Sequence, residues 1–245
     1  MNILAIDTSS KYFSLVIARD EKILVRFFEP LARELSAKLV PVIDGSLKKA
    51  RLALEDIDYF GAGLGPGSFT ALRIGLAAMK GLVFPFNKPI AGVPSLDVLA
   101  HSAKSVAAAF MPLTENATIC PVVDARRGLL YCAVYRFKKG RLSRKSRYLL
   151  IPIKDLLARL DSGTKTVFLG DGVPLYRKDI EKSLGEKAEF AKEEAWYPLP
   201  ENLLACVREK IRQGKLTDSY KLVPLYLYPK ECQVGNKEKD KGVRK

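Results

Sequence analysis

The chain opens with MNILAIDTSS at residues 1–10, an apolar run that ends at Asp7 and is followed by three hydroxyl residues. The stretch PVVD at residues 121–124 has the same form 117 residues later. Short apolar runs bounded by turn residues are typical of buried strands. A second strand and a glycine-containing turn follow each run, so we predict an α/β fold of two tandem βββαβα units that face each other across a cleft.

Periodicity and turn signals place the other elements. In the first unit we expect strands at 3–6, 13–18, 23–27, 59–64 and 90–93, and helices at 33–51, 70–84 and 95–109. Pro41 should kink the first helix or mark its first turn. In the second unit we expect strands at 121–124, 131–137 and 167–169, a hairpin turn at 138–140, and helices at 153–160 and 201–213. The predicted domains are residues 1–104 and 105–229, followed by a disordered basic tail at 230–245.

Composition excludes several classes of protein. The four cysteines form no CxxC pair, which excludes a zinc knuckle or a thioredoxin-type motif. Free thiols are typical of the reducing cytoplasm, where we expect this protein. The sole histidine is His101, so a two-histidine metal site cannot be built. No apolar run approaches the ~18 residues of a membrane span, and the apolar run at 3–6 is too short for a signal peptide.

Positive charge is concentrated in the second half of the chain. The formal net charge is +14, of which residues 1–100 carry +2 and residues 101–245 carry +12. The densest stretch, RFKKGRLSRKSR at 136–147, has seven basic residues and no acidic one. Clustered basic side chains bind polyanions such as RNA through phosphate groups, although a solvated hairpin explains the stretch equally well. The candidate phosphate contacts are Arg141, Arg144, Lys145 and Arg147.

Three turns carry residue types that hold phosphate groups in other α/β proteins. The first places a carboxylate and two hydroxyls at the carboxyl end of a strand, where ligands collect. The second, GPGSFT at 65–70, starts a helix whose free amides can hold an anion, but it lacks the Walker lysine. Each of these turns can equally be a plain tight turn. The candidate residues are Asp7, Thr8, Ser9, Gly65, Gly67, Ser68 and, in the matching turn of the second unit, Gly170 and Gly172.

The helix expected at 70–84 is apolar nearly all round. Arg73 and Lys80 are its only charged residues. A helix that covers a sheet needs one apolar stripe, whereas this helix has a stripe of small residues and a second stripe of larger ones. Either the helix is buried within the fold or its second face packs on another chain.

Specific strings of residues connect the chain to a known family. MNILAIDTS at 1–9 and GPGSFTALRIG at 65–75 resemble the TsaB (YeaZ) family, which are bacterial subunits of the tRNA threonylcarbamoyladenosine machinery. Ala71 stands where the family usually has glycine. The resemblance continues through GVPSL at 92–96, VDARR at 123–127 with Tyr131, GDG at 170–172, Tyr197-Pro198 and PLYL at 224–227.

The resemblance implies the actin, Hsp70 and sugar-kinase fold (the ribonuclease H-like ASKHA fold), which agrees with the tandem units. It also implies a non-catalytic cytoplasmic subunit that supports a TsaD-like paralogue, which transfers the threonylcarbamoyl group to the adenosine beside the anticodon of tRNA. A TsaE-like ATPase joins them. The metal-binding histidine pair of TsaD corresponds to RELSAKL at 33–39, which contains no histidine. We therefore expect no intrinsic cofactor, because ATP and metal belong to the partner subunits.

In this family the first two long helices pair with the equivalent helices of the partner. The resemblance therefore implies a heterodimer with the TsaD-like subunit, contact with tRNA through the complex, and a homodimer when the chain is alone. The implied interface residues are Leu35, Leu39, Ile43, Ile74, Leu76, Met79 and Val83.

Three alternatives stay open at this stage. An ATP-dependent small-molecule kinase of the same superfamily would use Asp7 or Asp124 as a base, although such kinases usually need longer chains. A metalloprotease-like enzyme is disfavoured by the single histidine. An RNA-binding module that works without partners is the third alternative.

Overall fold

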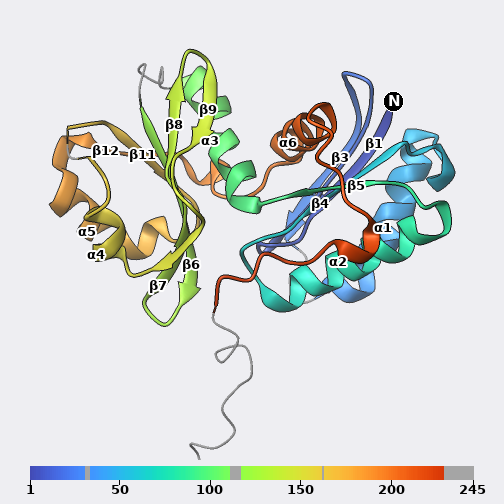
Figure 1. Cartoon of the computed structure of the whole chain (residues 1–245), viewed down its shortest axis with the longest axis horizontal. Coiled ribbons are helices and arrows are strands. Elements are labelled where there is room, and N and C mark those ends of the chain that lie inside the picture. The colour runs from blue at the N-terminus through green and yellow to red at the C-terminus, as the bar shows by residue number, and fades with distance from the viewer. Residues whose placement is uncertain (31–33, 111–116, 162, 229–245) are drawn as a thin grey trace, which may run out of the picture.

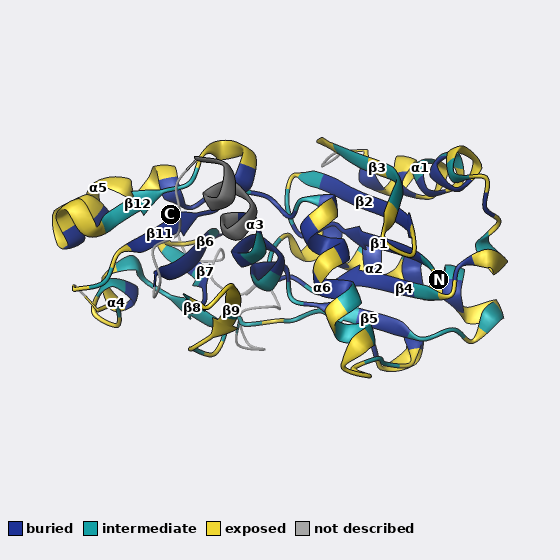
Figure 2. Cartoon of the chain, turned by 90° about the horizontal axis from the view of Figure 1, so that it is seen from above, coloured by how far each residue is buried: buried dark blue, intermediate teal, exposed yellow. Residues whose placement is uncertain are grey.

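The structure, a computed structural model, describes residues 1–30, 34–110, 117–161 and 163–228. The predicted basic tail at 230–245 lies outside the described residues. Two lobes lie side by side, each built on one sheet (Figure 1). Figure 2 shows buried residues along the central strands of both sheets, so each lobe has a core of its own.

The first lobe is built on a five-stranded sheet in the order β3-β2-β1-β4-β5. Antiparallel pairing joins the first three strands, and β4 and β5 continue from β1 in parallel. The side chains of the central strand alternate between two cores, with Leu4 and Ile6 in one and Ile3 and Ala5 in the other. The strands are β1 (Asn2–Asp7), β2 (Tyr12–Arg19), β3 (Lys22–Pro30), β4 (Tyr59–Gly63) and β5 (Ile90–Val93).

The second lobe repeats this plan. Its main sheet has the order β10-β7-β6-β11-β12, which is the order of the first sheet strand for strand. This doubling confirms the predicted α/β fold of two tandem units. The strands are β6 (Thr118–Arg126), β7 (Leu129–Cys132), β10 (Leu149–Ile151), β11 (Thr166–Leu169) and β12 (Ala188–Phe190).

A hairpin interrupts the second unit and corrects one prediction. The strand predicted at 131–137 is two strands, β7 and β8 (Tyr135–Lys138), and β8 forms a hairpin with β9 (Arg141–Arg144). The break falls at Val134, whose backbone N–H donates to Ser146 Oγ at 2.9 Å, and β8 then pairs with β6 again. The predicted turn at its tip is confirmed, since Lys139 and Gly140 both have positive φ.

In the residues that the structure describes, six α-helices flank the two sheets. The predicted helix at 153–160 is shorter than expected, and Pro41 lies inside α1 rather than in its first turn. Short 3₁₀ turns lie at Leu54–Asp56, Phe84–Phe86, Gly185–Lys187, Glu193–Ala195 and Ser219–Lys221. The helices are α1 (Leu35–Ala50), α2 (Phe69–Val83), α3 (Ser95–Phe110), α4 (Ile153–Leu157), α5 (Val173–Leu184) and α6 (Pro200–Arg212).

The last helix of each unit covers the sheet of the other unit. Leu203 and Val207 of α6 pack with Ile3 of the first sheet, on the face opposite α1 and α2 (Figure 1). Leu96 and Leu99 of α3 pack on the second sheet. The predicted domain boundary at residue 104 falls inside α3, and each hydrophobic core is completed by a helix from the other half of the chain.

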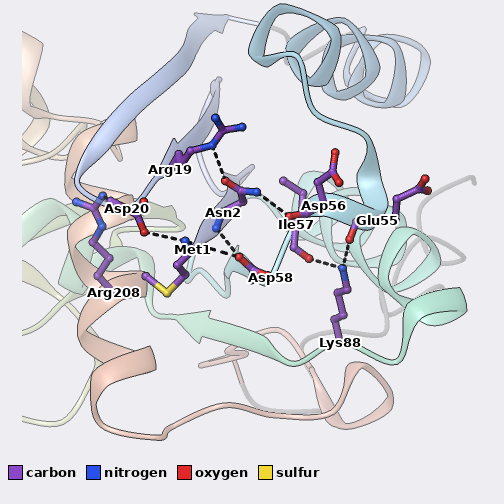
Figure 3. Close-up of polar contacts among 10 residues, drawn as sticks. All are labelled: Met1, Asn2, Arg19, Asp20, Glu55, Asp56, Ile57, Asp58, Lys88 and Arg208. Carbon is purple, nitrogen blue, oxygen red and sulfur yellow. Dashed lines mark hydrogen bonds and ion pairs between the residues drawn. The ribbon is translucent and has the colours of Figure 1, made fainter.

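Polar contacts fasten the far end of the first lobe (Figure 3). The N-terminal amine of Met1 donates to Asp20 Oδ1 at 2.7 Å, and this bond lowers the pKa of Asp20. Arg208 of α6 donates to the backbone carbonyl of Asp20, and its Nη1 lies 3.2 Å from Glu21 Oε2. These contacts tie the β2–β3 turn to a helix from the other end of the chain.

One helical stretch reaches the length and apolarity of a membrane span, contrary to our expectation from the sequence. It covers Phe69–Phe86, which is α2 and the turn that follows it. In the structure Leu76, Met79 and Val83 of this stretch are buried against the first sheet. Part of the apolarity of this stretch is explained by its packing in the core of the first lobe.

Candidate functional site

The predicted turn at Asp7 is a closed hydrogen-bonded structure. One carboxylate oxygen of Asp7 accepts the backbone N–H of Ser9 at 2.8 Å, and the other accepts the Ser95 hydroxyl at 2.6 Å. The Ser95 hydroxyl in turn accepts the N–H of Gly65 at 3.1 Å. Burial raises the pKa of Asp7, although these bonds oppose the rise. The carboxylate thus holds the turn after β1 against the start of α3.

The glycines of the second predicted turn allow backbone to approach backbone. A Cβ at Gly67 would lie 2.1 Å from the Ser9 carbonyl oxygen, and a Cβ at Gly63 would lie 2.0 Å from Asp7 Oδ2. The N–H of Ser68 donates to that Ser9 carbonyl at 2.8 Å. Asp7, Ser9, Gly67 and Ser68 are therefore brought together as predicted. The Gly65 and Ser68 amides of this turn donate to protein oxygens, which favours the tight-turn interpretation for them.

Thr8 joins this turn to helix α2. Its hydroxyl donates to the Ala71 carbonyl at 2.9 Å. Gly75 lies one helical turn further on, where a Cβ would lie 2.3 Å from Thr8 Oγ1. The predicted motif residues thus hold β1 and α2 at close range.

In the matching turn of the second lobe, glycines again allow a close approach to the backbone of a strand. Gly170 has φ +111°, and a Cβ there would lie 2.3 Å from the Val122 carbonyl oxygen. The N–H of Gly172 donates to the same oxygen at 3.1 Å. Both glycines therefore serve close packing against β6.

Two carboxylates lie beside this second turn. Asp171 Oδ1 accepts the N–H of Asp124 at 3.1 Å, and Asp124 Oδ2 lies 3.1 Å from Nη1 of Arg126. Burial raises the pKa of Asp171, the charge of Asp124 adds to the rise, and the positive charges of Arg126 and Lys11 oppose it. Among the described residues no group of three or more His, Cys, Asp or Glu side chains is arranged to hold a metal ion.

Sequence reasoning missed an aromatic cluster that joins the two lobes. Tyr12 of β2 stacks on Phe28 of β3 at 4.5 Å and contacts the ring of Tyr197 at 4.7 Å. Nζ of Lys11 lies 4.9 Å from the centroid of the Tyr197 ring. Tyr197 belongs to one of the family-like strings, but no local pattern indicates that it meets β2.

Six of the seven predicted interface residues are buried in the core of this chain. They pack with β-strand residues beneath α1 and α2, and only Ile74 is partly exposed. The prediction that these side chains form an exposed interface is therefore wrong, because the larger apolar stripe of each helix faces the sheet. The six buried residues are Leu35, Leu39, Ile43, Leu76, Met79 and Val83.

Parts of the outer faces of the same helices are apolar as well. Val40 of α1 is 50% exposed, and Ala77 and Gly81 of α2 are exposed. A Cβ at Gly81 or at Gly45 would meet no atom within 4 Å. A hollow of about 490 Å³ lies between the helices, bordered by Val40, Leu47, Leu54 and Leu82 among others.

Part of α2 is covered by the last described segment of the chain itself. Tyr226 packs on Phe69 at 5.3 Å, and its hydroxyl accepts Nε of Arg73 at 3.0 Å. Tyr220 contacts Phe84 edge-on at 5.7 Å. The spare apolar face inferred from the sequence is therefore shared between this segment and the outer surface.

The basic residues of the candidate phosphate patch do not all lie on one face of the β8–β9 hairpin. In the register of β8 and β9, Arg144 pairs with Tyr135 and Arg141 pairs with Lys138. Alternate residues of a strand point to opposite faces, so Arg144 shares a face with the buried Tyr135 and Arg141 lies on the other face. Lys145 and Arg147 follow β9 and are exposed.

Known proteins are similar to this chain in amino-acid sequence. The chain is 30% identical over 234 residues to the tRNA threonylcarbamoyladenosine biosynthesis protein TsaB of Bacillus subtilis, which covers 95% of this chain and 96% of that protein. The chain belongs to the TsaB (YeaZ) family. It is also 33% identical to Escherichia coli TsaB over 137 residues, 56% of this chain and 55% of that protein.

Two further comparisons concern a family model and the fold. Residues 29–233 match the family model described as TsaD, tRNA N6-adenosine threonylcarbamoyltransferase. A YeaZ structure from Pseudomonas aeruginosa is similar in fold, with a TM-score of 0.77 at 22% identity over 92% of this chain and 99% of that chain.

Proposed function

We propose that this chain is a non-catalytic scaffold subunit of an assembly that attaches a threonylcarbamoyl group to adenosine in tRNA. The similarity to Bacillus subtilis TsaB along nearly the whole chain supports this role, since that protein is named for tRNA threonylcarbamoyladenosine biosynthesis. The match to the transferase family model suggests that the partner is a paralogue built on the same fold.

The observation that carries the proposal is the outer surface of α1 and α2. Small residues such as Ala77 and Gly81 are exposed there, so a helix of another chain can approach α2 closely. Val40 adds a larger exposed apolar side chain on α1. We call this outer surface of α1 and α2 the helix-pair surface, and we propose that it binds the TsaD-like subunit.

We further propose that catalysis belongs to the partner subunits. The described part of the chain offers no cluster of three metal ligands, and the Gly65, Ser68 and Gly172 amides of its glycine turns donate to oxygens of the protein. In this proposal the TsaD-like subunit supplies the metal, and a TsaE-like ATPase supplies ATP hydrolysis. The chain itself has no cofactor, and the assembly works in the cytoplasm where tRNA is modified.

The helix-pair surface is also where two copies of this chain would pair when the partner is absent. Exposed apolar surface gains free energy when it is covered. A homodimer formed in this way would compete with the heterodimer. Addition of the TsaD-like subunit should therefore convert the dimer of this chain into the mixed complex.

The interface is tested with Ala77→Glu and Gly81→Glu, which place charge on the helix-pair surface without entering the core. Each should abolish co-purification with the TsaD-like subunit. Leu175→Glu is the matched control, because Leu175 is 60% exposed on α5, the equivalent helix of the second lobe. Retention of the complex by both α2 variants, with circular dichroism unchanged, would remove the interface from the proposal. Leu76→Glu and Met79→Glu would instead place charge in the core.

The catalytic assignment is tested by reconstitution with the TsaD-like and TsaE-like proteins of the same organism. Modified tRNA should form with all components and disappear when the TsaD-like subunit is omitted. Formation of modified tRNA by this chain alone would overturn the non-catalytic assignment.

A further inference from the structure

A polar hollow of about 280 Å³ lies where α3, α6 and the β8–β9 hairpin meet. The sequence gives no sign of it, because its walls come from three segments that are far apart in the chain. They include His101 on α3, Arg144 on β9, and Lys210, Gln213 and Lys215 at and after the end of α6. We call it the Arg144 hollow.

Arg144 is held in position at this hollow. Its guanidinium carbon lies 4.0 Å from the centroid of the Tyr148 ring, and its Nη1 donates to the Ser146 carbonyl at 3.1 Å. The Tyr148 hydroxyl donates to Asp97 at 2.9 Å, which fixes the ring beneath the guanidinium. An arginine that is already ordered loses less conformational entropy when it binds a ligand.

Two lysines add positive charge to the same hollow. Lys210 and Lys215 line it from the far end of α6. Within the part of the chain that the structure describes, Arg144, Lys210 and Lys215 form no salt bridge. Their charges are therefore not neutralised by a paired carboxylate.

The two acidic residues of the hollow are engaged by other groups. Asp97 accepts the hydroxyl of Tyr135 at 2.6 Å as well as that of Tyr148. Oε1 of Glu209 accepts Nε2 of Gln213 at 2.8 Å. The Arg144 hollow thus combines three cations with two carboxylates that already have hydrogen-bond donors, which is an arrangement that suits an anion.

We propose that the Arg144 hollow binds a phosphate group of an RNA backbone. This inference rests on the proposed function, in which the assembly acts on tRNA. Residues 101–245 carry a net charge of +12, and exposed basic residues continue from the hollow at Lys145, Arg147 and Arg212. Guanidinium and ammonium groups position a nucleic acid through its phosphates without reading its sequence. The site joins one residue of the predicted patch to a helix end that was not part of it.

The proposal is tested with two triple variants that remove the same charge. Arg144→Gln, Lys210→Gln and Lys215→Gln together empty the hollow of cations. Lys138→Gln, Lys139→Gln and Arg141→Gln together remove three cations from the tip and opposite face of the same hairpin. Binding of a tRNA transcript is measured by fluorescence anisotropy over a salt series, for the full chain in complex with the TsaD-like subunit.

The hollow variant should weaken binding about fivefold near 0.15 M salt and reduce the salt slope by about 0.9, since those are the contributions of one phosphate contact. The hairpin-tip variant should change binding less than threefold. Tyr148→Leu, which removes the ring beneath Arg144 at constant charge, should weaken binding with little change in slope.

Equal weakening by both triple variants would overturn the proposal, because RNA would then be attracted by the overall positive charge and not by the hollow. Unchanged RNA binding by the hollow variant would also overturn it. Loss of co-purification without loss of RNA binding would assign the hollow to a protein contact and also overturn it. If the wild-type complex fails to form, the proposed function fails, and the same salt series on the chain alone still decides whether the hollow binds RNA.

Discussion

Alanine in place of Gly75 and of Gly81 should change the stability of the protein in opposite directions, although both glycines lie in α2. A Cβ at Gly81 meets no atom within 4 Å, whereas a Cβ at Gly75 would lie 2.3 Å from Thr8 Oγ1. The Thr8 hydroxyl is held by its bond to the Ala71 carbonyl at 2.9 Å. Thr8 cannot withdraw without breaking a buried hydrogen bond.

The expected magnitudes follow from these contacts. Alanine in place of a helical glycine stabilises by about 1 kcal/mol, and nothing opposes this gain at Gly81. At Gly75 the same gain is outweighed by overpacking, which costs about 1–3 kcal/mol, and by the loss of the Thr8 hydrogen bond, which costs about 1–3 kcal/mol. The net destabilisation by Gly75→Ala is about 3 kcal/mol near the middle of the resulting range.

Thermal unfolding followed by circular dichroism at ~222 nm measures both changes. About 1 kcal/mol corresponds to about 2–4 °C in Tm for a chain of this size. We expect Gly81→Ala to raise Tm by that amount and Gly75→Ala to lower it by about 6–12 °C. Combining Gly75→Ala with Thr8→Ala should recover part of the loss, since the two sites are in contact. A neutral or stabilising effect of Gly75→Ala would refute the close packing of α2 on the β1 turn.

Two further predictions concern buried titratable groups. Burial raises the pKa of Asp7 above its usual value of 3.8. Between that value and the raised pKa the folded state binds more protons than the unfolded state, so the stability of the wild-type protein should fall as pH rises from 3.8 through the raised pKa. Asp7→Asn should flatten this dependence in urea midpoints measured at several pH values, and an unchanged slope would contradict the burial of a titrating carboxyl. Burial also raises the pKa of three thiols, which should resist iodoacetamide in the native protein, as peptide mass spectrometry will report; labelling at the rate of a free thiol would contradict their burial. These thiols are Cys120, Cys132 and Cys206.

The interface prediction shows what the apolar pattern of a helix does not determine. Both apolar stripes of α2 are visible in the sequence, but a stripe does not say which neighbour covers it. In the structure the stripe with Leu76 and Met79 packs on the sheet, and the one with Ala78 and Leu82 lies nearer the surface. Ala71 and Gly75 of the small stripe are buried as well, so the side that is open to another chain is marked by Ala77 and Gly81.

The candidate phosphate patch shows a similar limit. Seven basic residues at 136–147 are visible in the sequence, yet the alternation of those on β8 and β9 between the two faces depends on the register of the pair. Lys210 and Lys215 join Arg144 only because α6 returns to the first sheet. No local pattern could have placed them together.

By itself the sequence determined the two strand-and-turn units and the residues that close their turns, because the spacing of apolar residues, glycines and aspartates within a few positions decides these features. Only the tertiary structure decided that α3 and α6 exchange lobes, that the larger stripe of α2 faces inward, and that one arginine of the basic hairpin meets the end of α6. Each of these depends on which distant surface covers an apolar face, and many surfaces compete for that place until the whole chain has folded.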